Sequence, residues 1–423
     1  MIRNWARTTF KSLENRNFRV LWIGTTLSFL AFMMSSIVQS VVAFDLTGRN
    51  GAVGAVALGM GVATIVISPF GGVIADRVSK KRLLLIGQVA IGLNFAAVGV
   101  LILTDQVAIP WLIASTFVLG AVFAFIAPAR QAWIGELLPG EALPNGIALQ
   151  QIAMTATRIV GPFLAGGLIA LSFVGTGGTY LFMGGLFAIV VATLGQLPPT
   201  QSREKGTGPS VLGDFKLGVS HLTERPPLLL LVLSFIGIII TGFSYFVVLP
   251  GYLENELGRQ SRDISLMFGV SAVSGLVVTL GLASMAGSRR AWHVMIGGGV
   301  MMGVSLLFTA VSQNFGQALL TMLFIGAGSS AFQLINNSLV MQNSAPAFYG
   351  RVMSVTMLAW GLNSLVGFPL GLLADRIGER ETLFIMGVLV LMVSAATAIV
   401  RFGFIRGESP VRGLAPTEVG GGD

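Results

Sequence analysis

The chain has 423 residues, of which 54% are hydrophobic and only 10% are charged, whereas about a quarter of the residues in soluble domains are charged. A soluble fold needs more polar residues than this to cover its surface, so we expect a membrane protein. The absence of Cys excludes disulfides and thiolate metal sites. The formal net charge of +8 is not gathered on the basic, aromatic-rich soluble face that a nucleic-acid partner requires.

Long apolar runs follow one another along the chain, and about 20 such residues suffice to cross a hydrocarbon core roughly 30 Å thick. In the first half the predicted helices are Val20–Phe44, Gly51–Ala75, Leu83–Leu103, Ile109–Ala129, Leu143–Phe173 and Gly178–Leu197. In the second half they are Leu228–Leu253, Ile264–Met285, Val294–Ser312, Gln317–Val340, Val352–Ala374 and Leu383–Phe404. The first run is too long for a signal-peptide core, so we predict that it is retained. The fold class is therefore an all-α membrane protein with about twelve transmembrane helices.

Basic residues are unequally divided between the segments that connect these helices. With a cytoplasmic N-terminus, nearly all Lys and Arg residues lie on the inner side, and the outer segments hold only Arg49, Arg259, Arg262, Arg376 and Arg380. Lys and Arg are retained on the cytoplasmic side of membranes. We therefore predict a multi-pass protein with both termini in the cytoplasm, whose basic inner face lies against anionic lipids.

The longest polar stretch between predicted helices, residues 198–227, divides the chain. It contains Pro198-Pro199 and mixed charge, which is typical of a flexible linker, and Ser210 within it is predicted to cap a short helix on the inner membrane surface. The predicted units are a six-helix bundle over residues 1–197, this cytoplasmic linker, a second six-helix bundle over residues 228–406, and a disordered Gly- and Pro-rich tail over residues 407–423.

Short matches relate the two bundles. Leu119-Gly120-Ala121 corresponds to Ile325-Gly326-Ala327, and Val160-Gly161 corresponds to Val366-Gly367 at the same offset. Internal duplication with about six helices in each half is typical of transporters whose substrate site lies between the halves. We expect two pseudo-symmetric bundles related by an axis along the membrane normal.

The connection after the second predicted helix carries a spaced set of small, acidic and basic residues, Gly72, Asp76, Arg77, Lys80 and Lys81. In this set the chain resembles the major facilitator superfamily, whose best-known motif is Gly-x-x-x-Asp-Arg-x-x-Arg/Lys-Arg/Lys; Ser79 stands where the family usually has a second Gly. The resemblance covers nearly the whole chain and implies a transporter. We interpret Asp76-Arg77 as a gate latch in which Asp76 meets the helix N-terminus around 350–353, or Arg130, when the inner side is closed.

Other stretches resemble bacterial exporters of drugs and siderophores of the enterobactin-exporter type, among them Asn17-Phe18-Arg19 and Gly350–Ser354. Gly161, Pro162 and Gly166 resemble the fifth-helix motif of antiporters. The resemblance implies multidrug-type efflux across the inner membrane of a bacterium, driven by the proton gradient. Thr116 stands where many antiporters have an Arg, which departs from the family's proton mechanism.

Polar and aromatic side chains on apolar helices are candidates for the substrate cavity, because such groups either bond across helices or face water. The candidates are Ser35, Ser36, Gln39, Phe123, Arg158, Tyr245, Gln333, Asn336, Asn337, Trp360 and Asn363. Arg158 lies about 22 Å along its helix at 1.5 Å per residue, where a guanidinium must avoid lipid. We expect it to face the protein interior with several polar contacts, in either a structural or a substrate role.

No carboxylate lies deep in a predicted helix, so proton coupling depends on a peripheral acid such as Asp45, depends on a protonatable substrate, or is absent. Besides a proton-coupled exporter, a lysophospholipid or lipid flippase and a uniporter remain open. A membrane enzyme is disfavoured, since His221 and His293 begin no metal-ligand spacing and no carboxylates cluster in the membrane. We expect a monomer without cofactor or metal whose partners are a small-molecule substrate, membrane lipids and protons.

Overall fold

The computed structural model describes residues 11–138, 142–198, 220–282, 285, 288, 290–344 and 348–404. Within the helices a few side chains, including those of residues 68–77, are outside the described set. Most of the predicted linker, with the helix expected after Ser210, and the predicted tail are also outside it.

The first half consists of six long helices after a short 3-10 turn, η1 (Lys11–Glu14). They are α2 (Arg16–Thr47), α3 (Asn50–Arg77), α4 (Lys80–Leu103), α5 (Ile109–Leu137), α6 (Ala142–Ala170) and α7 (Gly175–Gly195). Each of them includes a segment long and apolar enough to cross a membrane, where all backbone polar groups must be bonded internally.

The second half begins with a span built from α9 (Pro226–Ile238), the π-helical turn η2 (Ile239–Phe243), α10 (Tyr245–Gly251) and a second π-helical turn, η3 (Tyr252–Glu256). The 3-10 turn η4 (Ser261–Asp263) leads into α11 (Ile264–Leu282). The remaining elements are α12 (Ala291–Val311), α13 (Phe315–Asn343), α14 (Tyr349–Ile377), α15 (Glu379–Ile399) and its π-helical extension η7 (Val400–Phe404). The described residues contain 12 candidate spans, which confirms the predicted fold class.

Several helices are longer than the apolar runs that predicted them. Helix α5 continues from the predicted end at Ala129 to Leu137, so Arg130 lies inside a helix and not in a loop. Helix α3 likewise includes Asp76 and Arg77, and only Val78 and Ser79 separate it from α4. Hydropathy detects the part of a helix that matches the hydrocarbon, whereas backbone hydrogen bonding continues into the polar boundary.

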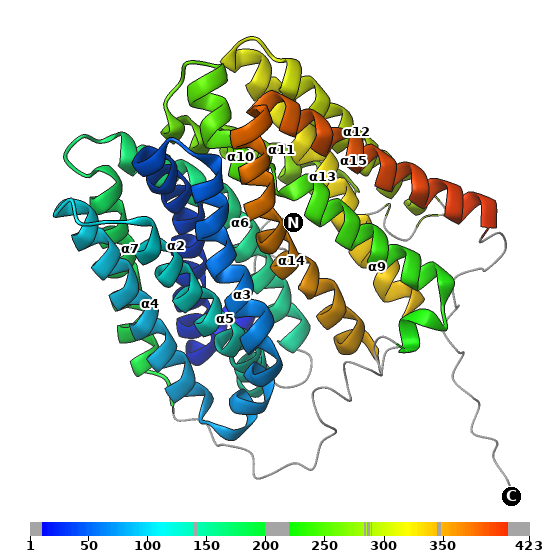
Figure 1. The fold of residues 1–423 in the computed structure, drawn as a ribbon. Coiled ribbons are helices and arrows are strands. Elements are labelled where there is room, and N and C mark those ends of the chain that lie inside the picture. The colour runs from blue at the N-terminus through cyan, green and yellow to red at the C-terminus, as the bar shows by residue number, and fades with distance from the viewer. Residues whose placement is uncertain are drawn as a thin grey trace, which may run out of the picture.

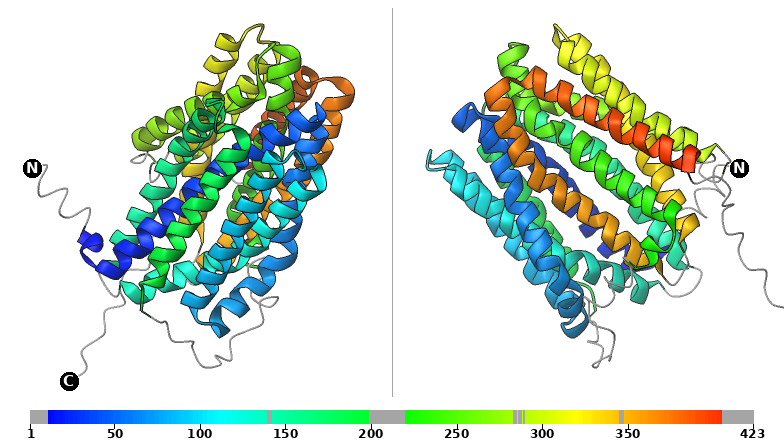
Figure 2. Two further views of the ribbon diagram at one scale, coloured as in Figure 1. Left: turned by 90° about the vertical axis from the view of Figure 1, so that its left-hand side faces the viewer. Right: turned by 45° about the vertical axis from the view of Figure 1, so that its right-hand side comes forward.

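The two halves repeat the same helix pairings. Helix α3 packs on α5 as α11 packs on α13, α4 packs on α7 as α12 packs on α15, and α4 and α5 pair as α12 and α13 do. The halves lie side by side (Figure 1), and they meet where α3 contacts α14 and where α6 contacts α11. In Figure 2 the long helices of both halves lie roughly along one common direction.

The bundle has two ends. The linker end is the one where α2 begins, α7 ends and α9 begins; the distal end is the opposite one, where α2 ends and α3 begins. At the distal end Gly48 closes α2 with a φ of 63° and donates its N–H to Phe44, a left-handed conformation that favours glycine. At the linker end the Asn15 side chain accepts from the N–H groups of Asn17 and Phe18 and caps α2.

Candidate functional site

Hydrogen bonds join the two halves at the distal end. The Asp375 carboxylate, in the last turn of α14, accepts the backbone N–H groups of Asn50 at 2.7 Å and Gly51 at 2.9 Å. These groups belong to the first turn of α3, where backbone N–H groups have no intrahelical partner and the helix dipole favours a negative charge. Asp375 therefore caps a helix of the opposite half.

The side chain of Asn50 is the centre of this junction and is only 1% exposed. Its Nδ2 donates to Glu379 Oε1 at 2.9 Å, and its Oδ1 accepts the Gly251 N–H at 3.2 Å. Asn255 Nδ2 donates to the same Glu379 oxygen at 2.6 Å. A second link between the halves runs from Ser261 Oγ to Asp45 Oδ1 at 2.6 Å.

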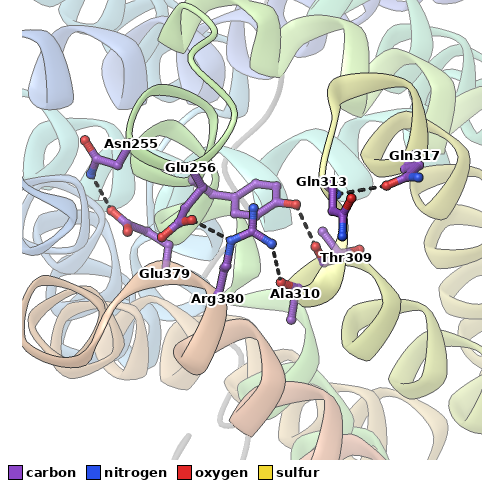
Figure 3. Close-up of polar contacts among 9 residues, drawn as sticks. Asn255, Glu256, Thr309, Ala310, Gln313, Gln317, Glu379 and Arg380 are labelled. Atoms are coloured by element: carbon purple, nitrogen blue, oxygen red, sulfur yellow. Dashed lines mark hydrogen bonds and ion pairs between the residues drawn. The ribbon is translucent and has the colours of Figure 1, made fainter.

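The start of α15 is tied to neighbouring segments of its own half (Figure 3). Arg380 Nε pairs with Glu256 Oε2 at 2.5 Å and Arg380 Nη1 donates to the Ala310 carbonyl at 3.1 Å, while Glu379 points toward Asn255. A polar pocket of about 570 Å³ adjoins the junction and is lined from both halves, by Gly48, Arg49, Asn255, Leu372, Ala374, Asp375, Arg376, Gly378 and Glu379. The junction therefore borders a space that water can enter.

This junction was not predicted, although the sequence contains a signal for it. Gly371, Asp375, Arg376, Gly378 and Arg380 repeat the spacing of the motif that begins at Gly72, and they include the second Gly that the first copy lacks. The chemistry also repeats, because Asp375 caps α3 in the way that Asp76 was expected to cap α14. The predicted Asp76 latch itself, with Gly72 and Arg77, lies outside the described side chains.

The two lysines of the motif that begins at Gly72 make specific contacts within the first half. Lys80 Nζ pairs with Glu136 Oε1. Lys81 Nζ donates to the carbonyl of Gly195 at 2.8 Å and to that of Leu197. These lysines therefore hold the start of α4 against the ends of α5 and α7.

Glycines allow the halves to approach closely where α3 contacts α14 and where α6 contacts α11. A methyl group at Gly54 of α3 would lie 2.7 Å from the Gly367 carbonyl oxygen of α14, and one at Gly166 of α6 would lie 1.9 Å from Ser265 Oγ of α11. One at Gly161 would lie 2.6 Å from Cβ of Met33 within the first half. Helix α6 remains continuous through Pro162. The fifth-helix motif thus packs against α2 on one side and against α11 on the other.

Two different faces of α6 are exposed. One is apolar and includes Ile152, Val160 and Phe163, as expected for contact with lipid chains. The other carries Gln151 and Arg158, seven residues apart and therefore on one side of the helix, and both are exposed. This polar face lies between the directions of α2, which Gly161 meets, and α11, which Gly166 meets. It therefore turns toward the region between the two halves.

Arg158 forms no hydrogen bond or ion pair with another described residue. Its side chain is exposed on this polar face, so water is available as its partner. The several polar contacts expected of Arg158 therefore stay a prediction.

An aromatic cluster lies where α2 meets α5. The Phe123 ring is 4.6 Å from that of Phe32 and 6.2 Å from that of Phe29, measured between centroids. The guanidinium carbon of Arg130 lies 5.4 Å from the Phe29 ring centroid, and Arg130 is only 4% exposed. Among the described residues, its Nε has no hydrogen-bond partner. Sequence analysis missed Arg130 as a cavity candidate because it placed this residue in a loop.

The other candidates divide between packing and exposed positions. Asn336 donates to the Leu231 carbonyl at 3.0 Å, and Asn363 accepts from Ser244 Oγ at 2.8 Å, so both connect helices of the second half. Ser35 and Ser36 donate to carbonyls of their own helix, and only Ser36 is exposed.

The aromatic candidates of the second half form two pairs. Tyr245 is buried and stacks on Phe268, with 6.0 Å between ring centroids, and Trp360 meets Phe243 edge-on at 5.4 Å. Gln39, Gln333, Asn337 and Trp360 are half-buried. The structure therefore places these candidates in both halves without bringing them into one described contact network.

An apolar groove of about 760 Å³ lies along the surface of the α12–α13 pair. Its lining is Gly297, Val300, Met301, Val304, Ser305, Phe308, Val311, Ser312, Gln313, Gln317, Leu320, Thr321 and Phe324, with no Lys or Arg. No group of three or more potential metal ligands occurs among the described residues.

Comparisons with known proteins agree with this architecture. The family model described as Major Facilitator Superfamily matches residues 21–368. The chain is 24% identical to the staphyloferrin A transporter of Staphylococcus aureus over 79% of this chain and 83% of that protein. It is 22% identical to multidrug resistance protein MdtH of Salmonella typhimurium over 71% of each chain.

Solved structures share the fold at low sequence identity. A bacterial homologue of the human lysosomal transporter Spinster, in an inward-facing and unoccupied conformation, superposes with a TM-score of 0.74 at 11% identity, covering 92% of this chain and 97% of that one. A mutant of the nucleoside transporter NupG superposes with a TM-score of 0.71 at 13% identity, covering 90% of this chain and 99% of that one.

Proposed function

The chain belongs to the Major Facilitator Superfamily, so it is a transporter and not an enzyme. We propose that it exports hydrophobic or amphipathic small molecules across a bacterial inner membrane by alternating access. The observation that carries this proposal is the distal junction, in which Asp375 of one half caps α3 of the other. The two halves are joined at this junction by hydrogen bonds beside a polar pocket. They can therefore separate there without exposing a large apolar surface to water.

The orientation follows from charge. The distal end holds Arg49, Arg259, Arg262, Arg376 and Arg380, whereas most Lys and Arg residues belong to the linker end. With the positive side inside, the distal end is the outer end, and the conformation is closed toward the outside. In this conformation a substrate enters from the cytoplasm, between the halves.

The substrate region in this proposal is the space beside the exposed polar residues Ser36, Gln151 and Arg158. Phe123, Tyr245, Gln333, Asn337 and Trp360 remain candidates to line it as the halves move. Asn336 and Asn363 serve packing, because their side chains are buried and bonded across helices. Closing of the inner side is assigned to the Asp76-Arg77 latch, by analogy with the capping contact of Asp375.

Proton coupling is assigned to the distal acids. Asp45 links the halves through Ser261, so protonation would weaken a contact that must break before the outer side opens. The names of similar proteins, a siderophore transporter and a multidrug resistance protein, support amphipathic substrates. The α12–α13 groove offers no basic anchor for a lipid head group, which disfavours the flippase alternative.

Transport by the purified protein in vesicles tests this function. Vesicles loaded with dyes and amphipathic drugs are assayed for movement with and without an imposed pH gradient. Gradient-dependent accumulation on one side is expected. Movement that only equalises concentrations would indicate a uniporter, and movement of labelled phospholipid alone would indicate a flippase. If no compound moves with or without the pH gradient, the proposed transport is refuted.

A further inference from the structure

We propose that Arg130 and Arg158 bind the anionic group of the substrate beside an aromatic wall of Phe29, Phe32 and Phe123, which makes amphipathic carboxylates the substrate class. This inference rests on the proposed transport function and adds its chemical specificity. It begins from a buried cation that the fold leaves without an anionic partner among the described residues.

The environment of Arg130 is unfavourable for a charge in the absence of a ligand. The residue is 4% exposed, and its Nε has no hydrogen-bond partner among the described residues. Its guanidinium lies over the ring of Phe29, a contact that offsets only part of the hydration lost on burial. Burying a cation is favourable mainly when a hydrogen-bonded anion accompanies it.

The Arg130 side chain is buried, but it lies next to an exposed position on the same helix. Arg130 and Phe123 are seven residues apart on α5, on the side of the helix that meets the phenylalanines of α2. Ala127 lies between them, within one turn of each, and it is exposed. A small molecule can therefore approach this stripe of α5.

The register between α2 and α6 brings Arg158 to the same depth. Trp22 Nε1 donates to the Leu149 carbonyl at 3.0 Å, and Gly161 lies against Met33. Both helices run away from the linker end, so these two contacts place Phe29 opposite residues 156–157 of α6. Arg158 is adjacent to that level, on the exposed polar face. Arg130 therefore reaches Phe29 from α5, and Arg158 lies at a similar depth on the facing helix α6.

Neither guanidinium forms an ion pair with a described residue, and two like charges at one depth disfavour each other. A carboxylate between them removes both costs. The planar fork of Arg matches a carboxylate with two parallel hydrogen bonds. The phenylalanine rings supply an apolar surface for the rest of the molecule. A neutral or cationic drug would lack the first interaction.

The test compares binding of paired probes to the full-length protein in detergent. The probes are aromatic mono-, di- and tricarboxylates, each paired with its neutral carboxamide, measured by equilibrium dialysis. We expect at least one carboxylate to bind tenfold or more tightly than its carboxamide. Arg130→Gln and Arg158→Gln should each remove most of this difference by weakening the binding of the carboxylate. Arg82→Gln, which removes an exposed charge of α4 in the same half, is the matched control.

The outcomes of these measurements distinguish the anion site from the proposed function. Equal binding within every pair, or a preference that both Gln variants retain, overturns the anion site. If a Gln variant does not elute as a folded monomer, Arg130→Lys and Arg158→Lys replace it, and these should bind the carboxylate more weakly than the wild type by losing the fork. Transport of neutral compounds without any carboxylate preference would refute only this inference, whereas Arg-dependent binding without any transport would refute only the proposed function.

Discussion

Replacing Asn50 with Ala should open the distal end. The substitution removes the hydrogen bond to the Glu379 carboxylate and the one from the Gly251 N–H. A bond to a charged group contributes about 1.5–3 kcal/mol and a neutral one about 0.5–1.5 kcal/mol. If both are lost when the halves separate, the closed conformation loses about 2–4.5 kcal/mol relative to the open one. At about 1.4 kcal/mol per tenfold, the ratio of open to closed molecules rises by about 30-fold to more than 1,000-fold.

The assay measures the distance between spin labels on the two halves. The natural chain has no Cys, so labels attached to Gln106→Cys and Gln313→Cys, both exposed at the distal end, have no background. Asn94→Ala is the matched control, because Asn94 makes two hydrogen bonds to Ser115 within the first half. We expect Asn50→Ala to populate longer distances and Asn94→Ala to leave the distribution unchanged. Identical distributions in the two variants would refute the assignment of Asn50 to a gate.

Three further predictions concern other contacts. Gly166→Ala should impair transport in vesicle assays, because its methyl group would lie 1.9 Å from the Ser265 hydroxyl of α11. The methyl group of Gly167→Ala would meet nothing within 4 Å, so this variant should transport normally and should be as stable as the wild type or slightly more stable. Burial foremost, and then the positive charge of a neighbouring arginine, lowers the pKa of His221; the folded protein therefore binds the proton less readily than the unfolded chain. Thermal stability should fall as the pH drops below the ordinary histidine value of about 6.5, His221→Gln should reduce that loss, and His293→Gln should not. Asp45→Asn keeps an oxygen that can accept from the facing serine but loses the titration, so transport should lose pH dependence; a full pH dependence would exclude Asp45 from coupling.

The predicted architecture could be obtained from local properties of the chain. Apolar length predicts spans such as α4, whose observed bounds, Lys80–Leu103, differ from the predicted Leu83–Leu103 only at the polar start. The repeated Leu119-Gly120-Ala121 and Ile325-Gly326-Ala327 segments predict equivalent helices, and these are α5 and α13, which pair in the same way in their halves. Such signals depend on neighbours along the chain, so no tertiary information was needed.

The candidate site was only partly predictable. Asn336 and Ser36 are both polar residues on apolar helices, yet Asn336 is fully buried and bonded to another helix, whereas Ser36 is exposed. Which face of a helix is covered depends on the helix packed against it. A similar limit applies to Arg158, because its exposure depends on how α6 packs on α2 and α11.

The sequence alone determined that this protein spans a membrane many times, in two related halves with a strong charge asymmetry, because hydrophobic length, repetition and charge are properties of consecutive residues. Only the tertiary structure decided that Arg130 is buried over Phe29 and that Asp375 caps α3. Asp375 and Asn50 are 325 residues apart. Their contact exists because α3 and α14 cross the same membrane side by side, and only that packing brings a carboxylate to the unpaired N–H groups of a helix in the other half.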